Sequence, residues 1–152
     1  MDMDGKTIDS RKKVEPEETD SSYELKYIDI GNVTIEGISK KPEEMYFEDA
    51  PSRARRKVKH GSTILGTVRT YLKAIAYLNN PEKNLIVSTG FAVIDCNMKD
   101  INSKYLYYFL LSEQFISTVA AYSKGVSYPA INSTELKKFP ILIPPRVEQE
   151  KI

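Results

Sequence analysis

The side chains that could do chemistry gather in one basic stretch, Pro51–Lys73, which contains no Asp or Glu. It also holds His60, the single histidine of the chain. The 50 residues before it carry 14 acidic and 7 basic side chains, although the net charge of the whole chain is only +1. The cationic side chains of the stretch are Arg53, Arg55, Arg56, Lys57, Lys59, Arg69 and Lys73. Such a stretch fits a polyanion, most commonly nucleic acid. The alternative is a solvated basic face that pairs with the acidic N-terminal part.

The rest of the sequence offers no recognisable catalytic or metal-binding set. A nucleophilic triad needs a base beside a Ser or Cys, and His60 has no obvious orienting acid. One Cys and one His are too few for a zinc site. No phosphate loop of the GxxxxGKS or GxGxxG type is present. Glu48 and Asp49 keep a metal-dependent nuclease as an alternative, although no strand-borne Asp…Glu-x-Lys pattern follows them. The sequence therefore favours a binding protein that is not an enzyme and uses no cofactor.

Length and composition indicate one domain with a real core. The chain has 152 residues, of which 41% are hydrophobic. The single Cys96 excludes an internal disulfide and fits a reducing cytoplasm. No apolar run is long enough to span a bilayer, and the N-terminus lacks a signal-peptide pattern. We therefore expect a cytoplasmic protein with no membrane partner.

The first part of the chain predicts strands after a polar start. Residues 1–22 are polar and charged, and we expect them to form a flexible N-terminal arm. The predicted extended segments are Tyr23–Val33, Val33–Ile38, Met45–Phe47, Ser62–Arg69, Lys73–Asn79 and Asn84–Asp95. Ala50–Lys59 is predicted to be an irregular loop or a single helical turn. Gly90, inside the strongest β pattern, predicts a bulge or a close approach of another backbone or of a ligand.

The second part of the chain changes to a helical pattern. Asn102–Ser123 predicts two helices, with Ser103 and Ser112 as their caps. Phe139–Ile143 predicts a short apolar strand. Pro145 fits the first turn of a further helix, which we expect to be truncated at the end of the sequence. This order of elements predicts an α+β fold.

Four blocks of sequence resemble a known family. They are Glu48–Arg56 (EDAPSRARR) leading into Val58–Arg69 (VKHGSTILGTVR), Val87–Val93 (VSTGFAV), Lys104–Phe115 (KYLYYFLLSEQF), and Gly125–Ile152 with its Y-P-A-I-N and P-P-x-x-E-Q signatures. In this order, covering residues 45–152, they are similar to the target recognition domain of a type I restriction-modification specificity (S) subunit. The chain departs from the family at Ser62, where members often have Asp, and at Thr70, where they often have Pro.

The resemblance implies a curved, mostly antiparallel β globule with a helical segment, followed by the start of a long C-terminal spacer helix. The implied domains are the arm at 1–22, the target recognition domain at 23–144, and the start of a truncated spacer helix at 145–152. In the family, two recognition domains sit at opposite ends of two antiparallel spacer helices, and each reads one half of a split DNA site. The second domain would belong to the same chain or come from dimerisation.

The implied function is sequence-specific binding of double-stranded DNA without catalysis. In the family, modification subunits dock on the spacers and methylate the DNA, and a separate restriction subunit translocates and cleaves it. These subunits are therefore the implied protein partners. The alternative is an assembly module that docks a methyltransferase subunit without DNA readout of its own.

The candidate DNA-binding residues fall into two layers. Phosphate contacts are expected from Arg53, Arg55, Arg56, Lys57 and Lys59. Arg69 is the expected base reader, because its fork can pair with O6 and N7 of guanine; the alternative is an ion pair with an internal carboxylate. Further candidates are Thr67, Tyr71, Lys73, Ser88, Thr89, Lys124, Ser127 and Tyr128. For Ser88 and Thr89 the alternative is a satisfied strand hydroxyl.

Overall fold

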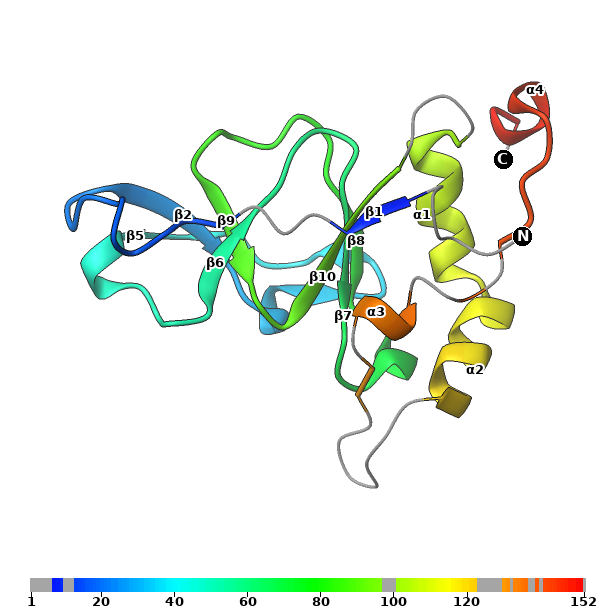
Figure 1. The fold of residues 1–152 in the computed structure, drawn as a ribbon, viewed down its shortest axis with the longest axis horizontal. Coiled ribbons are helices and arrows are strands. Elements are labelled where there is room, and N and C mark those ends of the chain that lie inside the picture. The colour runs from blue at the N-terminus through cyan, green and yellow to red at the C-terminus, as the bar shows by residue number, and fades with distance from the viewer. Residues whose placement is uncertain are drawn as a thin grey trace.

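The first of two four-stranded sheets lies at the centre of the molecule (Figure 1). The structure is a computed structural model that describes residues 7–9, 13–96, 101–122, 130–131, 133–136, 139 and 141–151. The sheet has the order β1-β10-β7-β8 and is antiparallel throughout. Its strands are β1 (Thr7–Asp9), β10 (Phe91–Cys96), β7 (Thr63–Gly66) and β8 (Ile75–Tyr77).

The second sheet packs on one side of the first and has the order β5-β2-β9-β6. Its β2–β9 pair is parallel and its other two pairs are antiparallel. Its strands are β5 (Glu43–Tyr46), β2 (Glu24–Ile28), β9 (Leu85–Ser88) and β6 (Ala54–Lys57). A two-stranded hairpin joins β3 (Val33–Thr34) to β4 (Gly37–Ile38).

Helices cover the other side of the first sheet (Figure 1). They are α1 (Ser103–Leu111) and α2 (Glu113–Tyr122), followed by the short α3 (Ser133–Leu136) and α4 (Arg146–Gln149). Three 3-10 turns, η1 (Ile30–Asn32), η2 (Phe47–Asp49) and η3 (Thr70–Leu72), lie in the strand-rich part. In the part of the chain that is described, no helix is long and apolar enough to cross a membrane. The expected α+β architecture with mostly antiparallel strands is confirmed.

The first sheet is buried on both faces, which explains the near-continuous apolar sequences of β7 and β10. Ile64 and Phe91 pack between the two sheets, whereas Leu65 and Ala92 pack beneath α1 and α2. Successive side chains point to opposite faces of a strand, so both faces of these strands need apolar residues. Fully burying an Ile, Leu or Phe side chain contributes about 1.5–3 kcal/mol.

The segment predicted as one strand, Asn84–Asp95, is two strands that belong to different sheets. β9 ends at Ser88, the chain turns at Thr89 and Gly90, and β10 begins in the other sheet. A Cβ added to Gly90 would lie 3.2 Å from Cδ1 of Ile30. The close neighbour of Gly90 is thus a side chain, not the backbone or ligand that the sequence predicted, and it lies where the chain crosses between sheets.

The prediction of a loop or helical turn over Ala50–Lys59 is wrong for residues 54–57, which form β6. Ala54 is buried, and the three basic residues after it are half-buried or exposed. Because β6 lies at the edge of its sheet, charged side chains are tolerated there. They replace the alternation of apolar and polar residues by which a strand is predicted from sequence. A β-bulge between Ala54 and Arg56 further disturbs the alternation.

The described residues of the predicted N-terminal arm are part of the fold, so the prediction of a flexible arm is wrong for them. β1 pairs with β10 through three residues. Val14 is buried against Leu25, Tyr27, Ala54 and Ile86, and its N–H donates to the Arg55 carbonyl oxygen at 2.8 Å. Hydrogen bonding to sheet edges, which a polar segment can provide, holds these residues in place.

Two further predictions near the helices differ from the structure, and one is confirmed. Asn102, not Ser103, caps α1, because its Oδ1 accepts from the backbone N–H of Lys104 at 2.9 Å. Ser112 caps α2 as predicted. The described residues of Phe139–Ile143 form no strand; Phe139 and Ile141 instead fill the core beneath the helices.

A buried polar pair joins β10 to the start of β7. The Ser62 hydroxyl donates to Oδ1 of Asp95 at 2.5 Å, and the Lys59 backbone N–H donates to the same hydroxyl at 3.1 Å. Both side chains are buried. The hydroxyl of Ser62, which directly precedes β7, therefore meets a carboxylate on the neighbouring strand β10.

Exchanging these two side chains tests the pair. Ser62→Ala should lower the free energy of unfolding by about 1–3 kcal/mol, because it leaves the buried carboxylate short of a donor. Ser62→Asp should cost more, because two carboxylates then share one buried site. The double variant Ser62→Asp/Asp95→Ser should recover most of the loss. Urea unfolding measures all three variants, and a Ser62→Asp variant as stable as the wild type would contradict the assignment.

Candidate nucleic-acid interface

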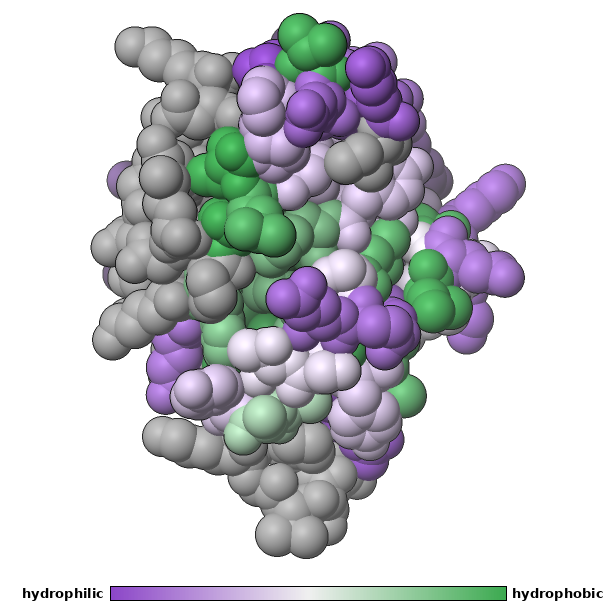
Figure 2. All heavy atoms as spheres, turned by 90° about the vertical axis from the view of Figure 1, so that its right-hand side faces the viewer, coloured by the Kyte–Doolittle hydropathy of each residue, from purple (hydrophilic) through white to green (hydrophobic). Residues whose placement is uncertain are grey.

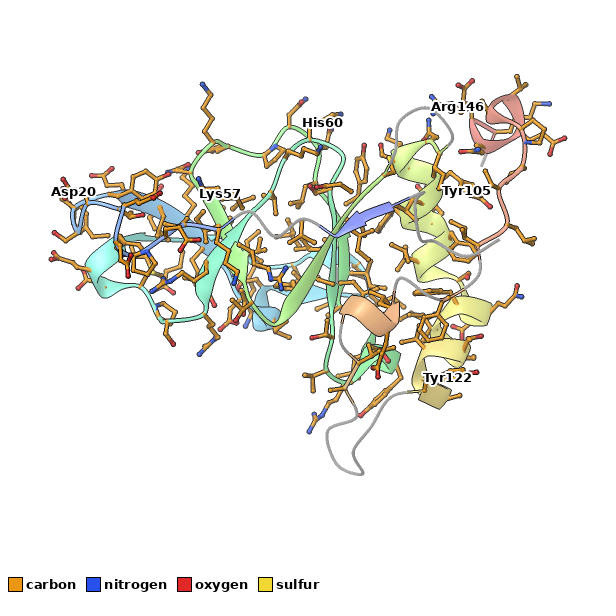
Figure 3. The ribbon with its side chains drawn as sticks, in the orientation of Figure 1. Asp20, Lys57, His60, Tyr105, Tyr122 and Arg146 are labelled. Atoms are coloured by element: carbon orange, nitrogen blue, oxygen red, sulfur yellow. The ribbon has the colours of Figure 1, made fainter. Side chains whose placement is uncertain are left out.

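The structure divides the basic stretch between the two ends of the sheets. Arg53 precedes β6 beside the β9–β10 turn, and its carbonyl oxygen accepts from the Thr89 N–H at 2.8 Å. Lys57 pairs with Ile86 toward the other end of β9. Figure 3 shows His60 near the upper side of the molecule with Lys57 below it, and Figure 1 shows the β9–β10 turn at the lower ends of β9 and β10.

Several predicted residues meet around the β9–β10 turn because backbone hydrogen bonds hold three segments together. The N–H and the hydroxyl of Thr67 each donate to the Gly90 carbonyl oxygen at 3.0 Å. The Ile131 N–H donates to the Thr67 carbonyl oxygen at 3.0 Å. We call this region the turn surface and define it by Arg53, Thr67 and Thr89, which these backbone hydrogen bonds bring together.

Arg53 is held by a carboxylate on the turn surface. Its Nη2 lies 2.7 Å from Oδ2 of Asp29, and its Nε donates to Oδ1 at 3.3 Å. The Arg53 side chain nevertheless remains 55% exposed. The hydrogen bond from Arg53 lowers the pKa of the Asp29 carboxyl, and the same pair raises the pKa of Arg53. Beneath them, burial raises the pKa of the Tyr27 hydroxyl.

Arg69 and Lys73 flank η3, and both have left-handed backbone conformations, with φ of 53° and 54°. Such conformations are uncommon outside glycine and cluster at functional sites. Arg69 is half-buried, and Tyr71 between the two cations is 51% exposed. The Lys73 amino group forms an ion pair with Glu113 at the start of α2 and is only 14% exposed. Lys73 therefore ties η3 to the helices rather than projecting toward a ligand.

The two hydroxyl candidates in the turn have different environments. Ser88 is fully buried, and its Oγ accepts from the Gly90 N–H at 3.0 Å. This geometry matches the alternative of a satisfied strand hydroxyl and leaves Ser88 away from the surface. Thr89 is exposed on the turn surface.

The other basic candidates are on and beyond β6. The Arg55 guanidinium lies 4.9 Å from the centre of the Phe47 ring and donates to the Ala54 carbonyl oxygen, which leaves it half-buried. Arg56 is also half-buried. Lys57 and Lys59 are exposed. The remaining candidates, Lys124, Ser127 and Tyr128, lie outside the described residues.

Asp29, which the sequence patterns did not indicate as a site residue, joins the turn surface to η1. Its Oδ1 accepts from the Ile30 N–H at 2.9 Å, and its own N–H donates to Oδ1 of Asn32 at 3.1 Å. This is a reciprocal capping box, and the D-x-x-N pattern of residues 29–32 is the local signal for it. Among the described residues, no group of three or more His, Cys, Asp or Glu side chains is placed to hold a metal ion.

Comparisons with known proteins agree with this architecture. A family model described as type I restriction modification DNA specificity domain matches residues 5–152. The type I restriction enzyme HindI specificity subunit of Haemophilus influenzae is 25% identical over 107 residues, which are 69% of this chain and 23% of that protein.

Two solved structures are similar over 99% of this chain and 39% of theirs. One is the HsdS subunit from Thermoanaerobacter tengcongensis, with 30% identity and a TM-score of 0.85. The other comes from work on complex assembly and conformational transition of the type I R-M system, with 28% identity and a TM-score of 0.87. The chain thus spans well under half of these relatives. The matched family confirms the resemblance, and the chain belongs to the type I restriction-modification DNA specificity domains.

Proposed function

We propose that this chain is a non-catalytic target recognition domain that binds double-stranded DNA and reads one half of a split site. Membership of the specificity-domain family supports a role in DNA recognition. The observation that carries the proposal is the turn surface, where Arg53, Thr67 and Thr89 come together from three segments fixed by backbone hydrogen bonds. Fixed polar groups of this kind suit base edges, which demand defined geometry.

Two layers of contact follow from the divided basic stretch. The turn surface supplies the candidate base readers Thr67 and Thr89, and Arg69 and Tyr71 at η3 are further candidates. Lys57 and Lys59 supply exposed charges for phosphates.

We further propose that the domain acts inside a cytoplasmic restriction-modification complex. Its partners would be the modification subunits, the restriction subunit and a second recognition domain in the same chain or a dimer. The short helix α4 after Pro145 would be the start of the spacer that links the two domains. The partial coverage of longer relatives is consistent with such an arrangement.

A second candidate function, docking of a methyltransferase subunit, has support from the helical side. Figure 2 looks onto this side and shows apolar side chains at its surface among polar ones. A hollow of about 190 Å³ there is lined by Phe109, Phe115, Phe139, Ile141 and Leu142, together with Gln114 and Thr118. Leu142 is 74% exposed. An exposed apolar surface with a polar surround suits a protein partner better than DNA.

Removing the two exposed lysines tests the phosphate layer. Lys57→Ala/Lys59→Ala should weaken binding to duplexes of every sequence by a similar factor. It should also reduce the slope of log affinity against log salt concentration by about 1 for each phosphate that is no longer neutralised. Fluorescence anisotropy at a series of salt concentrations measures both quantities.

The matched control is Lys40→Ala/Lys41→Ala, which removes two exposed lysines of the β4–β5 loop. It should leave the affinity and most of the slope in place. Equal effects of the two double variants would mean that Lys57 and Lys59 act only through net charge and would remove the phosphate layer from the proposal.

Leu142→Glu tests the docking surface separately. A buried charge is costly, so this change should weaken association with a modification subunit by about tenfold or more. It should leave duplex affinity unchanged, since Leu142 is not on the turn surface. Co-purification and anisotropy give the two readouts. If Leu142→Glu abolished DNA binding but kept association with the modification subunit, the helical side would bind DNA and the assignment of the two surfaces would be reversed.

A further inference from the structure

We propose that Arg53 reads a guanine in the major groove and that Asp29 is the residue that positions it. The inference rests on the proposed DNA-binding function and assigns Arg53 a role beyond the phosphate contact expected from the sequence. It also assigns a role to Asp29, an acidic residue in a surface that is otherwise suited to an anion.

Asp29 occupies only one edge of the Arg53 guanidinium. A guanidinium has five N–H groups, and Asp29 binds the side edge formed by Nε and Nη2. The end edge, formed by Nη1 and the second N–H of Nη2, is not the edge that Asp29 binds. Two parallel donors on this edge match O6 and N7 of guanine. The side chain is more than half exposed, so a base could reach it.

Both members of the pair are held rigidly. Asp29 is fixed by its capping box with Ile30 and Asn32. The backbone of Arg53 is anchored through its carbonyl oxygen, which accepts from the Thr89 N–H, and its guanidinium is held by the two hydrogen bonds to Asp29. Gly90 in the same turn packs closely on Ile30. The two residues are therefore anchored to one turn, and the fork is oriented before DNA arrives.

The neighbouring cations lack this combination. Arg55 lies over the Phe47 ring and is half-buried. Lys57 and Lys59 are exposed, but an ammonium group is a point charge without a planar fork. Within 53–59, Arg53 is the guanidinium that is both exposed and held by a bidentate carboxylate.

A guanine reader and a simple phosphate contact respond oppositely to loss of Asp29. If Arg53 only met a phosphate, removing the nearby negative charge would strengthen binding to all DNA. If Arg53 reads guanine, removing its support should weaken binding to the preferred site and leave other sequences unaffected or bound more tightly. The sign of the effect thus separates the two roles.

The test uses the whole chain and duplexes enriched by the wild-type chain from a random pool. Asp29→Asn is the key variant, because Asn still caps η1 but loses the charge and one acceptor for Arg53. We expect about a tenfold or greater loss of affinity for the enriched duplex and loss of preference at one G·C pair. Arg53→Lys should lose the same preference. Substituting 7-deazaguanine for guanine at that pair should weaken DNA binding by the wild-type chain but not by the two variants.

Lys26→Ala is the matched control, since it breaks an ion pair with Glu82 and Glu44 on a different part of the second sheet. It should keep the preference, and thermal unfolding should show that all variants are folded. Tighter binding of Asp29→Asn to every duplex would overturn the guanine assignment while leaving the proposed function in place. If the wild-type chain enriches no sequence, the proposed function and this inference both fail.

Discussion

The candidate interface depends on the crossing of the chain between two sheets at Thr89 and Gly90. β9 belongs to the second sheet and β10 to the first, so the turn between them must satisfy its backbone groups outside either ladder. The partners come from Arg53, just before β6, and from Thr67, just after β7. The Arg53 carbonyl oxygen accepts from the Thr89 N–H, and the Thr67 N–H donates to the Gly90 carbonyl oxygen. The contact of Gly90 with Ile30 leaves little room for a side chain. One structural requirement of the core therefore brings the polar candidates together.

Intramolecular contacts then decide which cations face outward. Lys73 is used to connect η3 with α2, and Arg55 is used to cover Phe47. Arg53 has a carboxylate partner but remains exposed. A basic stretch in a sequence is thus a mixture of structural and available charges. The acidic N-terminal part contributes to this sorting through Asp29, in line with the alternative of an internally paired basic face.

Sequence patterns predicted the features that are local. The Ser112 cap, the two helices and the apolar strands follow from side-chain period and capping chemistry. The patterns failed where a partner distant in sequence decides the structure. β6 forms because β9 pairs with it, and Val14 is buried because it packs against Leu25 and other apolar residues distant in sequence. Asp29 and Arg53 are 24 residues apart in the sequence, so a pattern of adjacent residues could not indicate that they form an ion pair. The predicted site residues therefore lie in the right region but mix buried residues such as Ser88 with exposed ones.

The most direct measurement of the central claim is a backbone amide NMR titration of the chain with a short mixed-sequence duplex at low salt. We predict that the largest shifts fall on the turn surface, at Arg53, Thr67 and Thr89, with smaller ones at Lys57 and Lys59. The amides around Phe109 and Leu142 on the helical side should stay unchanged. Shifts confined to the helical side, or no shift with excess duplex, would contradict DNA binding through the turn surface.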